Sequence, residues 1–403
     1  MVDLLAITAP RIFDSETWHD TAALVVPDGI VEAIAARGSI PEDARRIDLA
    51  GDLVPGFVDL QVNGGGGVLF NNQPDVAAIE AICRAHAQFG TTALLPTLIT
   101  DTAAVNEAAI AAGIDAVRAQ VPGFLSLHLE SPHLAIARKG THDLALIRPM
   151  DQSDLDRVLA PKRELPMLLV TVAAETAGPD QIKIMADAGI VVSIGHSDAD
   201  AITTERAFEA GARQATHLYN AMSQLQNREP GVVGAALGAR DVFAGLIADG
   251  IHVHPSVIRV AFAAKLGPGR IFLVSDSMSQ TGSDLTSFEL NGRTVYRANG
   301  DLRLANGTLA GADLDMIDAI HFMHEKVDVP WEEALRMASL YSSRAVGIDS
   351  NYGHLRPGAI ASFVELDGAQ MVSSTWVMGS CRYQAEGRVS VAHDTTSMRS
   401  FPA

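Results

Sequence analysis

The chain has 403 residues, and its composition excludes several classes of protein. Hydrophobic residues make up 48% of it, so the chain can bury a large core and divide into more than one domain. The 48 acidic residues outnumber the 30 basic ones, and the net charge of −18 disfavours nucleic acid or an anionic membrane as the general partner. The two cysteines, Cys83 and Cys381, lack the spacing of a disulfide framework.

The N-terminus and the hydropathy pattern predict a cytoplasmic protein by default. No basic region precedes an apolar stretch in the first residues, MetValAspLeuLeuAlaIle, and no window approaches the length of a transmembrane helix. A small anionic substrate stays compatible with the acidic composition, because a few local cations decide whether such a molecule binds.

Strand-like segments stand at both ends of the chain. Residues 21–26 and 30–35 are short apolar runs separated by turn residues, and residues 356–366 return to strand character after two helical stretches. We expect the ends, 1–54 and 356–403, to pair into one small β-sandwich domain.

The region between the ends, residues 55–355, alternates apolar runs with alanine-rich helical stretches such as 76–89 and 103–119. The strand candidates are 57–62, 92–98, 124–129, 167–173, 190–194, 213–216, 242–247 and 271–275. Eight strand–helix units over this length predict an α/β protein with a (β/α)₈ TIM-like barrel.

Four of these apolar runs are followed by a side chain that can bind a metal or move a proton: Glu130, His196, His217 and Asp276. Parallel strands of a barrel deliver such side chains to one mouth, so we expect the four to meet there. Two imidazoles and a carboxylate suit a divalent metal with one position open for water, and a further carboxylate can transfer protons. The pattern predicts a metal-assisted hydrolase.

A series of short motifs occurs along the chain in one order. They are ProGlyPheValAspLeuGlnValAsnGlyGlyGlyGly (55–67), HisLeuGluSerPro (128–132), LysGlyThrHisAsp (139–143), GlyHisSerAsp (195–198), ThrHisLeuTyrAsnAlaMet (216–222), ArgGluProGly (228–231), AlaAspGlyIleHisVal (248–253), ValSerAspSerMet (274–278), LeuAlaGly (309–311) and ArgAlaValGlyIle (344–348). Taken together, they resemble the N-acetylglucosamine-6-phosphate deacetylases of the amidohydrolase superfamily over essentially the whole chain.

The resemblance implies hydrolysis of N-acetylglucosamine 6-phosphate to glucosamine 6-phosphate and acetate. It assigns Glu130, His196 and His217 to one divalent metal, zinc or alternatively iron. Asp276 would take a proton from the attacking water and give it to the departing amine, and His142 would donate to the carbonyl oxygen and stabilise the oxyanion.

Other amidohydrolases carry a His-x-His pair for a second metal after the first strand, but this chain has Gln61 and Asn63 there. Neutral amides are poor ligands for zinc or iron, so we expect one firmly bound metal. The spacing recurs at His252 and His254, where the resemblance assigns His252 to the substrate and we interpret His254 as a residue at a helix start. His128 is interpreted as a supporting or core histidine.

For the sugar phosphate, the resemblance implies a set of binding residues: Asn220, Ala221, Arg228, His252, Leu309 and Ala310. The side chains of Arg228 and His252 would reach in from a neighbouring subunit, which predicts a homodimer. The backbone near Leu309 and Ala310 would contribute hydrogen bonds.

Three positions depart from the family pattern, namely Ser131, His133 and Ser277, and they put the substrate preference in question. One alternative is therefore a related hydrolase that acts on N-acetylgalactosamine 6-phosphate or another amide. A second alternative, a non-catalytic scaffold, is disfavoured because such a scaffold has no physical need for four polar groups in the barrel mouth.

Overall fold

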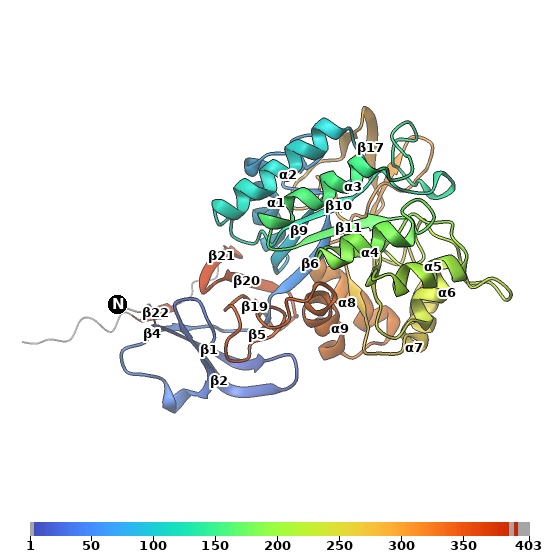
Figure 1. Ribbon diagram of the computed structural model, residues 1–403. Helices are drawn as coiled ribbons and strands as arrows, with labels where there is room; N and C mark the ends of the chain where they lie inside the picture. Colours follow the sequence, from blue (N-terminus) through green and yellow to red (C-terminus); the bar gives the residue numbers. More distant parts are fainter. Residues whose placement is uncertain (1–3, 387–390, 394–403) are drawn as a thin grey trace, which may run out of the picture.

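The computed structural model describes residues 4–386 and 391–393, and a parallel barrel forms its centre (Figure 1). Eight strands are hydrogen-bonded in the order β15-β14-β13-β12-β11-β10-β9-β6. Their bounds are β6 Phe57–Val62, β9 Thr91–Leu98, β10 Leu127–Glu130, β11 Leu168–Val172, β12 Val191–Ile194, β13 Gln214–Ala215, β14 Phe243–Leu246 and β15 Ile271–Leu273. Each coincides with one of the predicted strands, and the predicted barrel class is confirmed.

The barrel closes where β6 meets the segment that follows β15. The amide of Asn63 donates to the carbonyl of Ser277 over 2.9 Å, and the amide of Asp276 donates to the carbonyl of Gln61 over 3.0 Å. Val62 and Ser277 form an isolated parallel bridge at the same place. The residues after the last strand are therefore held directly against the first.

Helices surround the barrel because its strands are buried on both faces, as β11 is along its whole length. Their bounds are α1 Val76–Ala87, α2 Ala103–Arg118, α3 Gln152–Leu159, α4 Pro179–Asp187, α5 Ala201–Glu209, α6 Gly231–Gly238, α7 Pro255–Ala264, α8 Met316–Val327, α9 Trp331–Ala338 and α10 Leu340–Val346. Side-chain oxygens cap the first turns of several helices, which fixes where they begin. The capping residues include Asp75, Thr102, Asp151, Asp200 and Asp315.

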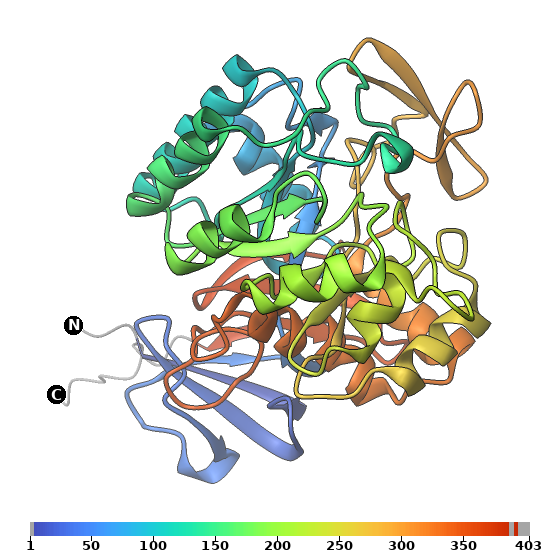
Figure 2. The same cartoon turned by 45° about the vertical axis from the view of Figure 1, so that its right-hand side comes forward.

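A second sheet of nine strands combines both ends of the chain, as predicted, and lies beside the barrel (Figures 1 and 2). Its strands are β1 Leu4–Phe13, β2 Trp18–Pro27, β3 Ala33–Ala36, β4 Arg45–Asp48, β5 Asp52–Pro55, β19 Phe363–Leu366, β20 Val372–Val377, β21 Ser380–Gln384 and β22 Val391–His393. The ends meet where β19 pairs antiparallel with β5. Part of the predicted C-terminal segment, 387–390 and 394–403, lies outside the described residues.

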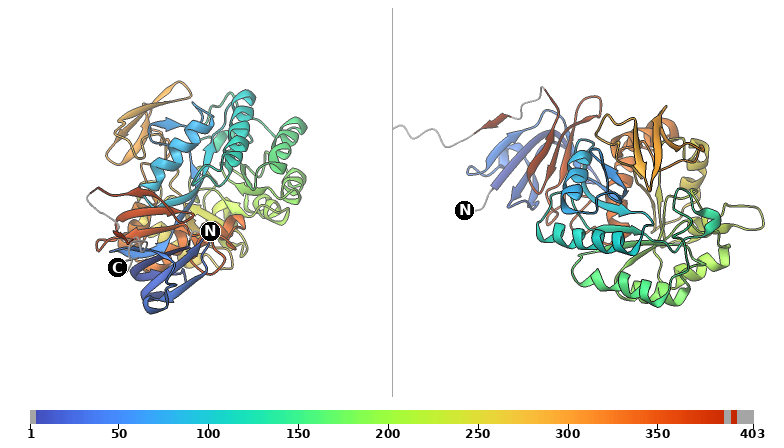
Figure 3. Two further views of the ribbon diagram at one scale, coloured as in Figure 1. Left: turned by 90° about the vertical axis from the view of Figure 1, so that its left-hand side faces the viewer. Right: turned by 90° about the horizontal axis from the view of Figure 1, so that it is seen from above.

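A third sheet, of three antiparallel strands, was not predicted: β16 Ser287–Leu290, β17 Arg293–Ala298 and β18 Asp301–Leu304. It stands apart from the barrel strands (Figure 3) and packs Leu290, Val295 and Leu302 against Met278. The signal that could have revealed it is a pair of Asn-Gly turns, Asn291-Gly292 and Asn299-Gly300. All four residues have a positive φ, as tight hairpin turns require.

The glycine run after β6 forms a small hairpin of β7 Gly64–Gly65 and β8 Val68–Leu69. A Cβ atom at Gly64 would lie 2.3 Å from the carbonyl oxygen of Val68, so only glycine fits there. Among the described residues, none of the helices combines the length and apolar character needed to cross a membrane.

Candidate active site

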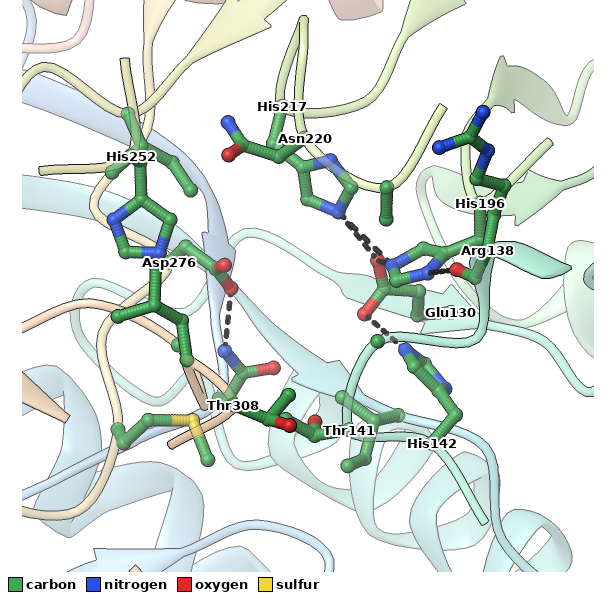
Figure 4. Close-up of a pocket in the computed structure, with 18 of the residues that line it drawn as sticks. Glu130, Arg138, Thr141, His142, His196, His217, Asn220, His252, Asp276 and Thr308 are labelled. Atoms are coloured by element: carbon green, nitrogen blue, oxygen red, sulfur yellow. Dashed lines mark hydrogen bonds and ion pairs between the residues drawn. The ribbon is translucent and has the colours of Figure 1, made fainter. Parts of the chain in front are cut away.

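The four predicted side chains meet at one mouth of the barrel (Figure 4). Glu130 ends β10, and His196, His217 and Asp276 follow β12, β13 and β15 by two or three residues. The latter three have left-handed backbone conformations, with φ of 47°, 30° and 48°. Such conformations cost a non-glycine residue about 1–3 kcal/mol each and cluster at functional sites. The backbone turns sharply after each strand and directs the side chain into the mouth.

Glu130, His196 and His217 surround a single point. The Oε1 atom of Glu130 lies 3.2 Å from Nε2 of His196 and 3.3 Å from Nε2 of His217, and the two nitrogens are 3.1 Å apart. Ligands of a tetrahedral zinc ion at bond lengths near 2 Å would be separated by about 3.3 Å. The three side chains, each 3–5% exposed, therefore fit a divalent metal.

The ring of His196 is held so that its Nε2 atom faces this point. Nδ1 of His196 donates to the carbonyl of Arg138 over 2.8 Å, which leaves the Nε2 lone pair directed at Glu130. Burial raises the pKa of Glu130, but the charge of His196 and hydrogen bonds from the surrounding imidazoles outweigh it and hold this pKa well below its usual range. Glu130 is thus ionised, as a ligand must be.

His142 is a third imidazole beside this cluster. Its Nε2 lies 3.5 Å from Oε2 of Glu130, and its Nδ1 lies 2.7 Å from the hydroxyl of Thr100. Possible ligand atoms of Glu130, His142 and His196 lie within 4.8 Å of one another, so His142 is a further candidate ligand. His196 and His217 share Oε1, whereas His142 faces the other oxygen, and this places it at the side of the site. Burial lowers the pKa of His142 to about 4, so the ring is neutral.

Gln61 and Asn63, in the position of the missing His-x-His pair, donate to the two carboxylates. The Gln61 amide lies 3.4 Å from Oε1 of Glu130, and the Asn63 amide lies 2.8 Å from Oδ1 of Asp276. Burial raises the pKa of Asp276, and the negative charge of Glu130 adds to this shift. Asp276 is therefore held in one orientation and accepts a proton more readily than an exposed aspartate.

The cluster opens into a cavity of about 490 Å³, a volume typical of small-molecule sites. Four of the predicted substrate-binding residues line it: Asn220, Ala221, His252 and Leu309. Arg228 is exposed and lies outside the lining of its own chain's cavity. Ala310 lies outside this lining, and its amide donates to the carbonyl of Leu302 in the three-stranded sheet region.

His252, which the resemblance assigns to the site of a neighbouring subunit, lines the cavity of its own chain. The ring lies in the wall of the cavity of its own chain (Figure 4), where its charge acts on the pKa of Asp276. Asp249 accounts for this placement: its carboxylate accepts the His252 amide over 2.8 Å and lies 2.6 Å from ring Nδ1. The turn after β14 is thereby fixed with the ring facing inward.

Further cavity residues were missed by sequence reasoning, namely Arg138, Thr141, Arg303 and Thr308. Arg303 and Thr308 belong to the region of the unpredicted sheet, so recognition of its Asn-Gly turns would have suggested them. Arg138 lies in a 3₁₀ turn, Ile136–Arg138, and its role depends on a backbone carbonyl that a sequence pattern does not reveal.

The positions that depart from the family pattern are buried in the protein matrix. Ser131 donates to the carbonyl of Thr171, and Ser277 lies 3.3 Å from Nε2 of His86. Ser131 and His133 line a separate small hollow of about 30 Å³. Among the described residues, none of the three departures lines the main cavity, so their influence on a substrate would be indirect.

The two histidines interpreted as structural have structural contacts. His128 lies beneath the site, with Nε2 2.8 Å from the hydroxyl of Thr171, and burial lowers its pKa to about 4. The His254 side chain accepts the amide of Ser256 and caps α7, which confirms its interpretation as a helix-start residue.

The barrel, the buried carboxylate–imidazole cluster at its mouth and the acid beside it define a hydrolase with a site suited to a divalent metal. The chain belongs to the amidohydrolase family, whose model matches residues 53–386.

Named relatives support this assignment over nearly the whole chain. The chain is 40% identical to an N-acetylgalactosamine-6-phosphate deacetylase of Shewanella sp. (strain ANA-3), covering 95% of this chain and 97% of the relative. It is 36% identical to an N-acetylglucosamine-6-phosphate deacetylase of Haemophilus influenzae, covering 89% and 93%. The crystal structure of N-acetylglucosamine-6-phosphate deacetylase from Pasteurella multocida is similar with a TM-score of 0.90 and 33% identity, covering 94% of this chain and 99% of that one.

Proposed function

We propose that this protein removes the acetyl group from N-acetylglucosamine 6-phosphate, giving glucosamine 6-phosphate and acetate. The observation that carries the proposal is the convergence of Glu130, His196 and His217 on one point, with Asp276 in the wall of the same cavity. This arrangement suits hydrolysis of an amide whose carbonyl binds at the cluster.

Glu130, His196 and His217 would hold one divalent cation, zinc or alternatively iron, because imidazole and carboxylate ligands suit both. When bound, the cation polarises the acetyl carbonyl and lowers the pKa of water. Gln61 and Asn63 would orient the carboxylates of Glu130 and Asp276, and they leave the second-metal position of related enzymes without a good ligand.

Asp276 would act as the general base and then as the general acid. It accepts a proton as water attacks the carbonyl and returns that proton to the nitrogen as the amine departs. The neutral ring of His142 would donate from Nε2 to the carbonyl oxygen, where negative charge develops. Both side chains border the cavity and are fixed by hydrogen bonds.

The phosphate would be recognised partly by a second subunit. His252, Asn220, Ala221 and Leu309 line the cavity of their own chain and would bind the sugar phosphate there. Arg228 is exposed and outside this lining, which suits a guanidinium that completes the site of a neighbouring copy in a homodimer.

A related activity on N-acetylgalactosamine 6-phosphate is the second candidate, favoured by the 40% identical relative of that name. The two sugars differ only at one hydroxyl, and the same cluster serves either amide.

One experiment decides between these readings. Acetate release would be measured from N-acetylglucosamine 6-phosphate, its galacto epimer and unphosphorylated N-acetylglucosamine, together with the metal content per chain. We expect about one metal and a preference for the phosphorylated gluco compound. Preference for the galacto compound would establish the second candidate, and absence of acetate from all three would refute deacetylation of these amino sugars.

A further inference from the structure

Asp59 is a buried carboxyl group that the proposed mechanism does not use. It lies within β6, two residues before Gln61, and its side chain is completely buried. Burial of a carboxyl group is costly unless hydrogen bonds compensate for it. Both carboxyl oxygens lie 3.3 Å from the amide of Ser275, and Oδ1 lies 3.2 Å from the amide of Gln61.

These contacts lie at the closure of the barrel, where the backbone leaves its regular course. β15 ends at Leu273, and the amide of Val274 still donates to β14 through the carbonyl of Leu246. The next two backbone amides are directed toward β6. The amide of Ser275 donates to the carboxyl group of Asp59, and the amide of Asp276 donates to the carbonyl of Gln61. Asp276 has the left-handed φ of 48° that this turn requires.

We propose that Asp59 is a positioning residue for the deacetylation, because it holds the strained backbone on which Asp276 is presented to the substrate. A strained residue persists only where its surroundings compensate for its cost. The amide of Ser275 lies beyond the regular strand pairing, and the carboxyl group of Asp59 accepts its hydrogen bond. It also fixes the backbone of Gln61, whose carbonyl accepts the Asp276 amide. This inference rests on the proposed role of Asp276.

Asp59→Ala removes the acceptor, and we expect kcat to fall by about 10- to 100-fold with little change in KM, because a small displacement of a reacting group has an effect of that size. Asp59→Asn keeps one acceptor oxygen and should give an intermediate kcat, and it serves as the main variant if Asp59→Ala does not fold.

The matched control is Glu365→Ala. Glu365 is another buried carboxylate that accepts two backbone amides, those of Ala50 and Gly51, but it lies in the sheet of the chain ends. The control should lower Tm and leave kcat unchanged.

A double-mutant comparison separates positioning from general stability. If Asp59 acts through Asp276, Asp59→Asn should have almost no further effect on the residual turnover of Asp276→Asn. The same fold-loss in both backgrounds, a change confined to KM, or full kcat in Asp59→Ala would overturn the proposal. Failure of the proposed function itself is recognised separately, because the unaltered protein would then release no acetate.

Discussion

His196, His217 and Asp276 share a backbone conformation that ordinary residues avoid, and this strain explains how the site is assembled. In a straight strand, the side chain of every second residue points into the barrel core. A residue with a left-handed backbone conformation just beyond the strand turns the chain, so that its side chain points into the mouth of the barrel. The chemistry thus depends on three local bends as much as on the identities of the residues.

The carboxylate of Asp276 is expected to be indispensable for turnover but not for metal binding. Asp276→Asn should lower kcat by about 100- to 10,000-fold, because it removes the general base and acid, while metal content stays at that of the unaltered protein. Acetate release and metal analysis would check this. Asp313→Asn is a matched control, since Asp313 also accepts from a side-chain amide, that of Gln280, but does not line the cavity. Normal kcat in Asp276→Asn would remove Asp276 from its assigned role.

Arg228→Ala should raise KM for the phosphorylated sugar by about 10- to 100-fold, the loss expected for a hydrogen bond to a charged group. KM for the unphosphorylated sugar should not change, because that substrate offers no phosphate. Initial rates over a range of both substrates would test this, with the exposed helical Arg206→Ala as control. Equal increases for both sugars would assign Arg228 to something other than the phosphate.

At the scale of elements, the segment from β15 to α8 carries much of the site and also a half-buried acid, Asp315, at a helix start. Asp315 caps α8 by accepting the amide of Asp318. Burial raises the pKa of Asp315 to about 7, and the nearby charge of Asp318 adds to the shift. An acid whose pKa is raised on folding stabilises the folded state below its unfolded pKa, and this contribution is lost as pH rises through the folded pKa.

Asp315→Asn keeps the capping oxygen but cannot ionise, so its stability should depend less on pH between about 4 and 7. Over that range, the unaltered protein should lose up to about 1.4 kcal/mol of unfolding free energy per pH unit relative to the variant, the limit for one proton. Denaturant unfolding at pH 5 and pH 7 would measure the difference. Thr102→Ala, which removes the cap of α2 but no titratable group, is the control and should lower stability without changing its pH dependence. Parallel curves for Asp315→Asn and the unaltered protein would contradict the expectation.

At the scale of the whole molecule, the barrel and the sheet of the chain ends have largely separate hydrophobic cores. The chain starts in one sheet, passes through the barrel and returns to the first sheet, where β19 pairs with β5. The cavity already has Arg138 and Arg303 in its lining, and in the proposed homodimer the exposed Arg228 would add a further cation from the second copy.

Mixing the Asp276→Asn and Arg228→Ala variants, each impaired at low substrate concentration, should restore activity if the sites are shared. In the proposed dimer, each site combines Asp276 of one chain with Arg228 of the other. A dimer of one Asp276→Asn chain and one Arg228→Ala chain therefore has one site with both substitutions and one site with neither. After random exchange of subunits, about one quarter of all sites should be intact, and turnover at low substrate concentration should recover to that fraction. Two copies of the same variant, mixed in the same way, provide the control. Recovery no greater than the sum of the separate variants would show that Arg228 does not act across a dimer.

Much of the site could be predicted from the sequence because its residues follow recognisable strands. The apolar runs that precede Glu130, His196, His217 and Asp276 mark the strands, and parallel strands bring their ends to one mouth. For the same reason, the eight barrel strands and the pairing of the chain ends followed from hydrophobic pattern alone. His254 was interpreted correctly because its neighbour, Pro255, favours the first turn of a helix.

Tertiary structure alone decided which way individual groups point. His252 faces the cavity of its own chain because Asp249 accepts its hydrogen bonds, and the amide of Ala310 donates to the carbonyl of Leu302. The contact of Asp59 with Ser275 joins positions far apart in the sequence. Periodicity reports which face of an element is buried, whereas these contacts depend on backbone bends and on partners from distant segments. The sequence determined the barrel and the set of reactive groups, and the closed structure determined their orientation, because only there do the distant hydrogen-bond partners meet.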